Sequence, residues 1–272
     1  MENEFLKITI NPLGAELTSI VNKKTHEEII WQADKSVWGR HAPVLFPVVG
    51  KLKEDHYVYH DKKFQLCQHG FARDLMHTQL SENEFELKSS EITKKHFPFD
   101  FVLKTSYRLE KNILHITYRV ENHSDELMPF SIGAHPGFVL KGNAPLRVEF
   151  EHKEAGVYRL KNGLVDFSHA HRSELVWLLK EENFKDDAMI FKNLKSKWVK
   201  LYEEDLIVTL HFQNLPFFGM WAKPRMPFLC LEPWWGVADT TLSSGNIMEK
   251  VGIQTLAART YEEYTYAIEV NI

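Results

Sequence analysis

The chain has 272 residues, of which 44% are hydrophobic and 26% charged, and its formal net charge is −4 with the histidines neutral. This globular composition excludes intrinsic disorder, and the absence of a basic excess argues against nucleic acid as a partner. Aromatic residues reach 12%, and there are 14 histidines. Aromatic rings stack on the faces of sugars and also fill large cores, so this enrichment fits either role.

The N-terminal residues and the cysteines bear on the expected compartment. Residues 1–7 show no basic segment followed by an apolar one, and no apolar run approaches the ~20 residues of a membrane-spanning helix. Cys67 and Cys230 are too few for a disulfide framework or a structural zinc site, so we expect each to be a small buried hydrophobe. We therefore expect a reduced, cytoplasmic protein that does not contact membranes.

Alternation of apolar and polar residues with a period of two dominates the chain and predicts β-strands. The alternating runs are 5–10, 57–64, 101–109, 114–120, 146–150, 206–212 and 264–270. Residues 57–64 predict a tight hairpin, and the short break at 110–112 predicts another between its two flanking runs. Short helices are expected near 174–183 and 243–250, the second capped by Ser243 or Ser244.

These elements predict a single domain over residues 1–272. Without an internal repeat or linker, the fold class is all-β: a large antiparallel β-sandwich with few short helices. The oligomeric state is left open, because an exposed C-terminal β-segment is a candidate for pairing with another subunit.

Polar residues interrupt apolar, strand-like runs at four places. The segments are 38–50 with Trp38-Gly39-Arg40-His41, 68–74 with Gln68-His69-Gly70-Phe71-Ala72-Arg73-Asp74, 131–138 with Gly133-Ala134-His135-Pro136-Gly137, and 228–236 with Cys230-Leu231-Glu232-Pro233-Trp234-Trp235. A buried histidine is usually a satisfied structural group, and Asp74 is an obvious ion-pair neighbour for Arg73. Glu232 is harder to explain structurally, because burying an unpartnered carboxylate is costly. A carboxyl group buried at a pocket gains a raised pKa, which suits a general base.

Cofactor motifs receive little support from the sequence. His169-Ala170-His171 with Glu174 has the residue types of a cupin-like metal site, but its spacing departs from that pattern and no glycines frame it. A solvated loop with exposed histidines is the preferred interpretation. The sequence holds no Gly-rich phosphate loop, HExxH or GxSxG. We expect neither a metal nor another cofactor.

In their order and spacing, the four segments resemble the aldose 1-epimerase family, the galactose mutarotase-like proteins, and in particular its shorter bacterial LacX-type branch. The resemblance covers nearly the whole chain and begins with Asn-Pro-Leu-Gly-Ala-Glu-Leu-Thr-Ser-Ile at 11–20. It implies a supersandwich of antiparallel sheets that holds a sugar in an open cleft.

The resemblance also implies roles for individual residues. Glu232 corresponds to the family's general base and His135 to its general acid, while His69 and Arg40 correspond to sugar-binding residues. The family's Asp that holds sugar hydroxyls corresponds to Asp187, with Asp186 as the alternative. Four tryptophans are candidates for stacking on the sugar: Trp38, Trp221, Trp234 and Trp235. We expect core packing for at least two of the four, and Trp234 is the one that we predict as a substrate-binding residue.

One motif points to a different branch of the family. His-Gly-Phe-Ala-Arg at 69–73 resembles the hexose-6-phosphate 1-epimerases, in which arginines near the cleft meet the phosphate. Arg40 and Arg73 are the candidates for that role here. The sequence therefore leaves open whether the hexose is phosphorylated.

The function predicted from these residues is an isomerase, an aldose 1-epimerase that interconverts the α and β anomers of a hexose such as galactose or glucose. A carboxylate and an imidazole on opposite sides of a pyranose suffice to move the C1 hydroxyl proton and to protonate the ring oxygen. The imidazole must start protonated or share a proton with the substrate. The alternatives are a hexose-6-phosphate 1-epimerase and a non-catalytic sugar-binding protein. In each case the partner is a small sugar or sugar phosphate.

Overall fold

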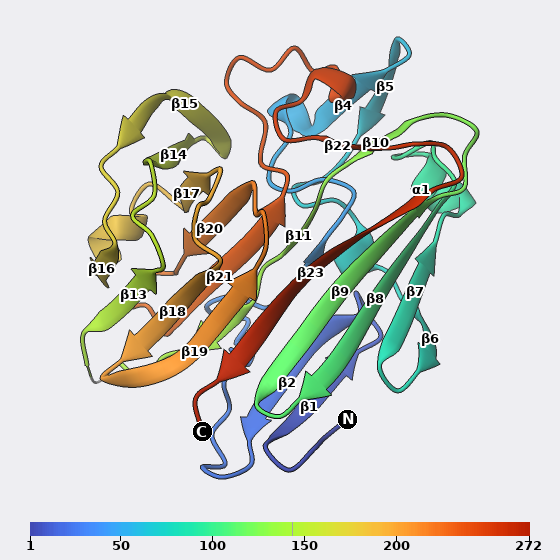
Figure 1. The fold of residues 1–272 in the computed structure, drawn as a ribbon. Coiled ribbons are helices and arrows are strands. Elements are labelled where there is room, and N and C mark those ends of the chain that lie inside the picture. The colour runs from blue at the N-terminus through green and yellow to red at the C-terminus, as the bar shows by residue number, and fades with distance from the viewer. Residues whose placement is uncertain (143) are drawn as a thin grey trace.

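The computed structural model describes residues 1–142 and 144–272, and most of their strands belong to two large antiparallel sheets (Figure 1). In the described residues, the larger sheet has nine strands. Their order is β16 (Val176–Leu179), β13 (Leu146–Phe150), β18 (Trp198–Glu203), β19 (Asp205–Phe212), β23 (Tyr261–Val270), β9 (Ile113–Asn122), β8 (Phe101–Glu110), β7 (Glu84–Lys88) and β6 (Thr78–Ser81).

The second large sheet carries most of the segments singled out in the sequence. Its path is β15 (Leu164–His171), β14 (Val157–Lys161), β17 (Met189–Lys192), β20 (Phe217–Trp221), β21 (Phe228–Trp235), β11 (Ile132–Ala134) and β3 (Val44–Leu45), and β12 (Gly137–Val139) also pairs with β21. Three further pairs lie outside these sheets: β1 (Leu6–Asn11) with β2 (Glu16–Asn22), β4 (His56–Tyr59) with β5 (Lys62–Gln65), and β10 (Met128–Phe130) with β22 (Gln254–Leu256).

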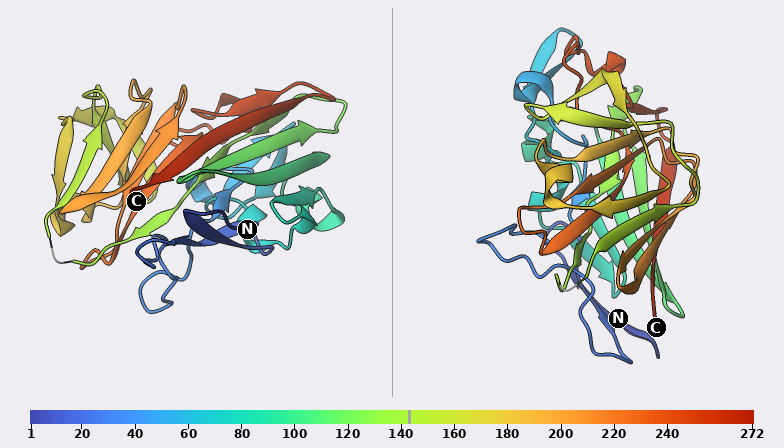
Figure 2. Two further views of the ribbon diagram at one scale, coloured as in Figure 1. Left: turned by 60° about the horizontal axis from the view of Figure 1, so that its bottom comes forward. Right: turned by 90° about the vertical axis from the view of Figure 1, so that its left-hand side faces the viewer.

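The core lies between the two large sheets. Phe150 of β13 contacts Phe191 of β17 with ring centroids 4.8 Å apart, and Trp235 of β21 lies 5.3 Å from Tyr264 of β23. Alternate side chains of each strand point into this layer, as the period-two pattern requires. The β1–β2 hairpin lies against the nine-stranded sheet beside β8 and β9 (Figure 2), where the Tyr107 hydroxyl donates to the Ala15 carbonyl at 2.6 Å.

The all-β sandwich and both predicted hairpins are confirmed. β8 pairs with β9 across the predicted break, with Glu110 opposite Ile113, and β4 pairs with β5 across a two-residue turn. His60 and Asp61 in that turn have left-handed φ angles of 46° and 58°, as a tight hairpin between right-twisted strands requires.

The predicted helix near 174–183 is wrong. Val176–Leu179 forms β16, an edge strand hydrogen-bonded to β13, and only a short 3-10 turn follows at Glu181–Phe184. Pairing with β13 overrides the weak helical pattern of this apolar run. Near 243–250 there is only the 3-10 turn Ile247–Glu249. Its cap is Asn246, whose side chain accepts from the Met248 amide, rather than Ser243 or Ser244.

Other expectations also need correction. The sequence did not predict α1 (Glu91–Lys94), which begins with a capping box at Ser90. The C-terminal segment is not an exposed edge, because β23 is hydrogen-bonded to β19 on one side and β9 on the other (red strand in Figure 1). Cys230 is buried as expected, whereas Cys67 is exposed. Of the described helices, none has the length and apolarity to cross a membrane.

Candidate active site

The seven predicted site residues meet in one place. They line a single cavity of about 530 Å³: Arg40, His69, Arg73, His135, Asp187, Glu232 and Trp234. Strands of the second sheet form its floor, and the segments around 38–40 and 68–73 contribute to its wall. The order of the motifs along the sequence therefore corresponds to a real convergence in space.

β21 places Glu232 at the floor of this cavity. Every residue of the strand is buried, because both of its faces are covered. Leu231 and Trp235 belong to the main core between the sheets, whereas Glu232 and Trp234 point to the opposite face, where the cavity lies. This double burial explains why the strand reads as a continuous apolar run interrupted by one carboxylate.

Glu232 and His135 form a close, buried pair. The Oε2 atom of Glu232 lies 3.2 Å from Nε2 of His135, and the two residues are 1% and 8% exposed. Neither carboxylate oxygen has a hydrogen-bond partner among the described residues. Burial, reinforced by the charge of Asp187, raises the pKa of Glu232 well above its usual range, as the sequence predicted. Burial therefore favours the neutral form of this carboxyl group, which lines the cavity.

His135 lies between β11 and β12, and its imidazole is surrounded by other aromatic rings. The Trp38 ring lies 5.0 Å away at an interplanar angle of 30°, and the rings of Trp221 and His69 meet the imidazole edge-on at 5.7 and 5.6 Å. Burial, together with the positive charge of Arg73, lowers the pKa of His135 to about 3. The imidazole is thus neutral in the free protein, in contrast to the imidazolium that a starting general acid would need.

His69 is held in a constrained turn on the same side of the cavity. The φ angle of His69 is +66°, and that of the following Gly70 is +69°. A Cβ atom on residue 70 would lie only 2.2 Å from the carbonyl oxygen of Phe46. The Gly50 amide donates to Nδ1 at 3.1 Å. Burial lowers the pKa of His69, and the nearby His135 and Arg73 add to that shift. His69 is therefore neutral, with Nδ1 occupied by the backbone.

Arg40 and Arg73 meet at Asp74. Arg40 Nη2 lies 2.8 Å from one Asp74 oxygen, Arg73 Nε lies 3.7 Å from the other, and Arg73 also donates to the Gln68 carbonyl at 2.7 Å. Burial and the charge of Arg40 lower the pKa of Arg73 to about 10. The cavity wall thus carries two guanidinium groups that share one carboxylate, which leaves net positive charge facing the cavity.

The two aspartates of the 185–190 segment lie differently. Asp187 lines the cavity, whereas Asp186 does not. Asp187 has a left-handed φ of +70°, and its Oδ1 accepts from the Ala188 amide at 2.9 Å. Its negative charge contributes to the raised pKa of Glu232, and both residues line the same cavity. Asp187 rather than Asp186 is therefore the aspartate in reach of a bound ligand.

The four candidate tryptophans divide by position. Trp38, Trp221 and Trp234 line the cavity, whereas Trp235 packs against Tyr264 in the core. Trp234 is 4% exposed and lies directly over Gly219, where a Cβ would come within 2.6 Å of its ring. Two of the four are consequently buried, as expected. Trp38 and Trp221 offer more of their ring surface to the cavity.

Two polar lining residues were not predicted from the sequence. Gln68 directly precedes His69, so its position beside a site residue was the only available signal. Lys223 has no sequence signal. It follows β20, and its Nζ lies 5.4 Å from the centre of the Trp221 ring.

The His169-Ala170-His171 segment, expected to be a solvated loop, is not where metal-ligating atoms converge. His169 and His171 lie on strand β15 rather than in a loop, although both are exposed as predicted. Within the described part of the chain, the atoms close enough to share a cation belong to His135, Cys230 and Glu232, all within 4.8 Å of one another. The donor types suit Zn²⁺. The neighbouring Arg40 and Arg73 oppose a cation there, because their positive charges already disfavour the imidazolium.

Comparisons with known proteins identify the family and the fold of this chain. The family model for aldose 1-epimerase matches residues 1–252. Protein LacX (chromosomal) of Lactococcus lactis subsp. lactis is 30% identical, with 92% of this chain and 91% of that protein covered. A galactose mutarotase related enzyme from Lactobacillus acidophilus is 33% identical with a TM-score of 0.94, covering 100% of this chain and 96% of that chain. A galactose mutarotase-like protein from Lactobacillus casei ATCC 334 is 30% identical with a TM-score of 0.89, covering 100% and 99%.

The chain belongs to the aldose 1-epimerase family. The fold is the mutarotase-like β-sandwich that the sequence predicted. Family membership and fold together support an isomerase that acts on carbohydrates.

Proposed function

We propose that this protein is an aldose 1-epimerase that interconverts the α and β anomers of a hexose such as galactose or glucose. The observation that carries the proposal is the pair of Glu232 and His135. Its reacting atoms lie 3.2 Å apart, it is buried at the cavity floor, and its carboxylate oxygens lack partners among the described residues. An unpartnered carboxyl group in a polar cavity is costly for stability, so its position favours a functional role.

In the proposed reaction, Glu232 acts on the C1 hydroxyl and His135 on the ring oxygen. Removal of the hydroxyl proton and protonation of the ring oxygen open the ring, rotation about the C1–C2 bond presents the other carbonyl face, and closure reverses the two roles. Both sugar oxygens are bonded to C1, so two groups 3.2 Å apart serve them side by side rather than from opposite sides. Each group contributes roughly 10²–10⁴-fold to the rate.

The pair needs one proton in total. The raised pKa of Glu232 and the lowered pKa of His135 assign that proton to the carboxyl group in the free protein. When the sugar hydroxyl approaches Glu232, the proton moves to His135 across the short contact. The carboxylate then accepts the C1 hydroxyl proton while the imidazolium donates to the ring oxygen. The one-proton pair therefore supplies both partners without protonating the free imidazole.

The other cavity residues bind the sugar. We infer that Asp187 accepts hydrogen bonds from hydroxyls, that Arg40 and His69 donate to them, and that Trp38 or Trp221 packs against the apolar face of the ring. Trp234 supports the floor beside Glu232. Mutarotation of freshly dissolved α-galactose and α-glucose, followed by polarimetry, tests this function, with the spontaneous rate as baseline and Glu232→Gln as the control protein.

A hexose-6-phosphate 1-epimerase is the second candidate, favoured by the two arginines on the cavity wall. A guanidinium group recognises phosphate through its planar fork of donors. On this hypothesis, Arg73→Ala weakens kcat/KM for glucose 6-phosphate about tenfold or more and leaves that for glucose nearly unchanged. Equal losses for both sugars would contradict a phosphate role. Sugar binding without anomer exchange on any of these substrates would instead support a non-catalytic sugar-binding protein.

A further inference from the structure

The turn between β1 and β2 contacts both arginine-bearing segments of the cavity wall. It corresponds to the Asn-Pro-Leu-Gly-Ala-Glu stretch at 11–16, which the proposed chemistry does not use. Gly14 has φ +74°, its amide donates to the Leu75 carbonyl at 2.8 Å, and a Cβ on it would lie 2.7 Å from the Arg73 carbonyl oxygen. The close approach of this turn to Arg73 therefore requires glycine.

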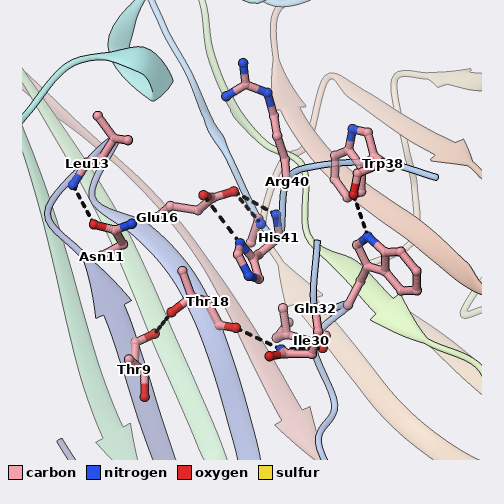
Figure 3. Close-up of polar contacts among 12 residues, drawn as sticks. Thr9, Asn11, Leu13, Glu16, Thr18, Ile30, Gln32, Trp38, Arg40 and His41 are labelled. Atoms are coloured by element: carbon pink, nitrogen blue, oxygen red, sulfur yellow. Dashed lines mark hydrogen bonds and ion pairs between the residues drawn. The ribbon is translucent and has the colours of Figure 1, made fainter. Parts of the chain in front are cut away.

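Glu16, at the end of the same turn, holds the segment that follows Arg40. Its Oε1 atom accepts from the amide of His41 at 2.8 Å and from that of Ala42 at 3.1 Å. Its Oε2 atom lies 3.6 Å from His41 Nδ1, and the Glu16 side chain is only 14% exposed. Figure 3 shows the Glu16 carboxylate directed at His41, while the Arg40 side chain extends away from it.

The other side of this segment is fixed to β12, which begins two residues after His135. The Gly137 amide donates to the His41 carbonyl at 2.9 Å, and Gly137 lies two residues after His135. Residues 41–42 are thus clamped between the Glu16 carboxylate and the His135 segment. Hydrogen bonds from backbone amides to a carboxylate are stronger than hydrogen bonds between neutral groups. Glu16 therefore holds residues 41–42 more firmly than the Gly137 amide does.

We propose that Glu16 is a positioning residue that fixes Arg40 relative to the Glu232–His135 pair. The turn that carries it is itself anchored, because the Tyr107 hydroxyl of β8 donates to the Ala15 carbonyl. A rigid link therefore runs from the nine-stranded sheet through Glu16 to the cavity wall. The proposal rests on the proposed function only in taking Arg40 as a group that orients the substrate.

Removing the Glu16 carboxylate leaves the amides of His41 and Ala42 without their acceptor, so residues 40–42 can shift. Substrate orientation then weakens while Glu232 and His135 stay in place, so the loss falls on KM rather than kcat. In Glu16→Ala, we expect KM to rise about tenfold with kcat nearly unchanged. One oxygen accepts both amides, so Glu16→Gln retains that acceptor and restores most of the wild-type KM.

Glu28 provides a matched control. Its Oε1 atom also accepts backbone amides, those of Ile20 at 2.9 Å and Ile30 at 2.9 Å, but it does not line the cavity. Glu28→Ala therefore reproduces the loss of a bracing carboxylate that accepts from residues 20 and 30 rather than from residues 41 and 42. We expect its KM to match the wild type. In an Arg40→Ala background, Glu16→Ala adds no further rise in KM if Glu16 acts through Arg40.

A second readout does not depend on activity. Arg40 is 31% exposed, and its reaction with phenylglyoxal, followed by peptide mass spectrometry, reports how firmly it is held. We expect the modification rate of Arg40 to rise several-fold in Glu16→Ala, but not in Glu16→Gln or Glu28→Ala. If the wild-type protein does not accelerate anomer exchange, the proposed function fails, yet this comparison still decides the role of Glu16.

Three results would overturn the proposal. One is an unchanged KM and Arg40 reactivity in Glu16→Ala, and another is an equal effect of Glu28→Ala, which would indicate general loosening of the fold. The third is a Glu16→Gln protein as impaired as Glu16→Ala, which would assign the effect to the charge of Glu16 near Arg73 rather than to its hydrogen bonds.

Discussion

Nε2 of His135 lies 3.2 Å from Oε2 of Glu232 at the floor of the cavity, and both side chains are at least nine-tenths buried. Burial disfavours the charged form of each group, so it raises the pKa of Glu232 and lowers that of His135 to about 3. The free pair therefore holds one proton over a wide range of pH. This shared proton is the basis of the first two predictions.

The pH dependence of kcat/KM reports the titration of the free enzyme. We expect no acidic limb near 6.5, the ordinary pKa of histidine, because His135 gains a second proton only near its lowered pKa of about 3. Activity declines on the alkaline side when Glu232 loses its proton, well above the ordinary value of 4.5. Anomer exchange measured by NMR, with the spontaneous rate subtracted at each pH, checks this profile. A decline centred near 6.5 would show that His135 titrates as an exposed histidine.

Glu232→Gln is expected to stabilise the fold while it abolishes activity. The folded pKa of Glu232 is raised, so the folded protein retains a proton that the unfolded chain loses above about 4.5, and stability falls as pH rises through this window. Glutamine has no charged form, so we expect the free energy of unfolding to rise by about 1–2 kcal/mol at pH 8 and to be unchanged below pH 4.5. Urea unfolding at pH 8 and at a pH below 4.5 measures this difference. A gain that is absent or independent of pH would contradict the raised pKa.

His135 gives stability the opposite pH dependence. Its folded pKa is lowered, so below 6.5 the unfolded chain binds a proton that the folded protein does not, and stability is lost on acidification toward pH 3. His135→Gln is expected to reduce this loss. The same unfolding experiment at pH 5 and pH 7 separates the two groups, because Glu232→Gln leaves the histidine contribution in place.

Asp187 and Asp186 form a natural matched pair. Asp187 lines the cavity and Asp186 does not, although they are neighbours in sequence with the same charge. We expect Asp187→Asn to raise KM about tenfold, since a hydrogen bond to a charged group is lost, and Asp186→Asn to leave KM within about twofold. Steady-state kinetics on galactose and glucose provide the measurement. A larger effect at position 186 would reverse the assignment.

Gly137 limits the position of Trp38 over His135. A Cβ at residue 137 would lie 2.9 Å from the Trp38 ring, whose centroid is 5.0 Å from that of the His135 imidazole at an interplanar angle of 30°. Gly137→Ala is therefore expected to displace the ring and to lower kcat/KM about tenfold, with a change in tryptophan fluorescence. Unchanged activity in Gly137→Ala would argue against a role for this contact between Trp38 and His135.

The sheet structure was largely predictable from the sequence because alternation reports burial directly. The 101–109 and 114–120 runs became β8 and β9, in which alternate residues are buried. Residues 176–179 were not predictable in this way, because a short apolar run fits a helix or a strand equally well until its pairing partner β13 is known. Likewise, the central place of β23 depends on long-range pairing with β9 and β19.

The candidate site was predictable in composition but not in geometry. The motifs identified Glu232 and His135, whereas their 3.2 Å contact and the neutral state of the imidazole depend on the packing of β21 against β12 and the Trp38 loop. Lys223 carries no local pattern that distinguishes it from a surface lysine. The exposure of Cys67 was missed for the same reason, because a single cysteine does not report its own burial.

Polarimetry of freshly dissolved α-galactose and α-glucose, with wild-type protein, Glu232→Gln protein and no protein, tests the central claim most directly. We expect the wild-type protein to accelerate mutarotation, and we expect Glu232→Gln, folded and at least as stable, to return the rate to the spontaneous one. Full acceleration by Glu232→Gln would contradict the assignment of Glu232 as the group that acts on the C1 hydroxyl. No acceleration by the wild-type protein would contradict a neutral hexose as substrate.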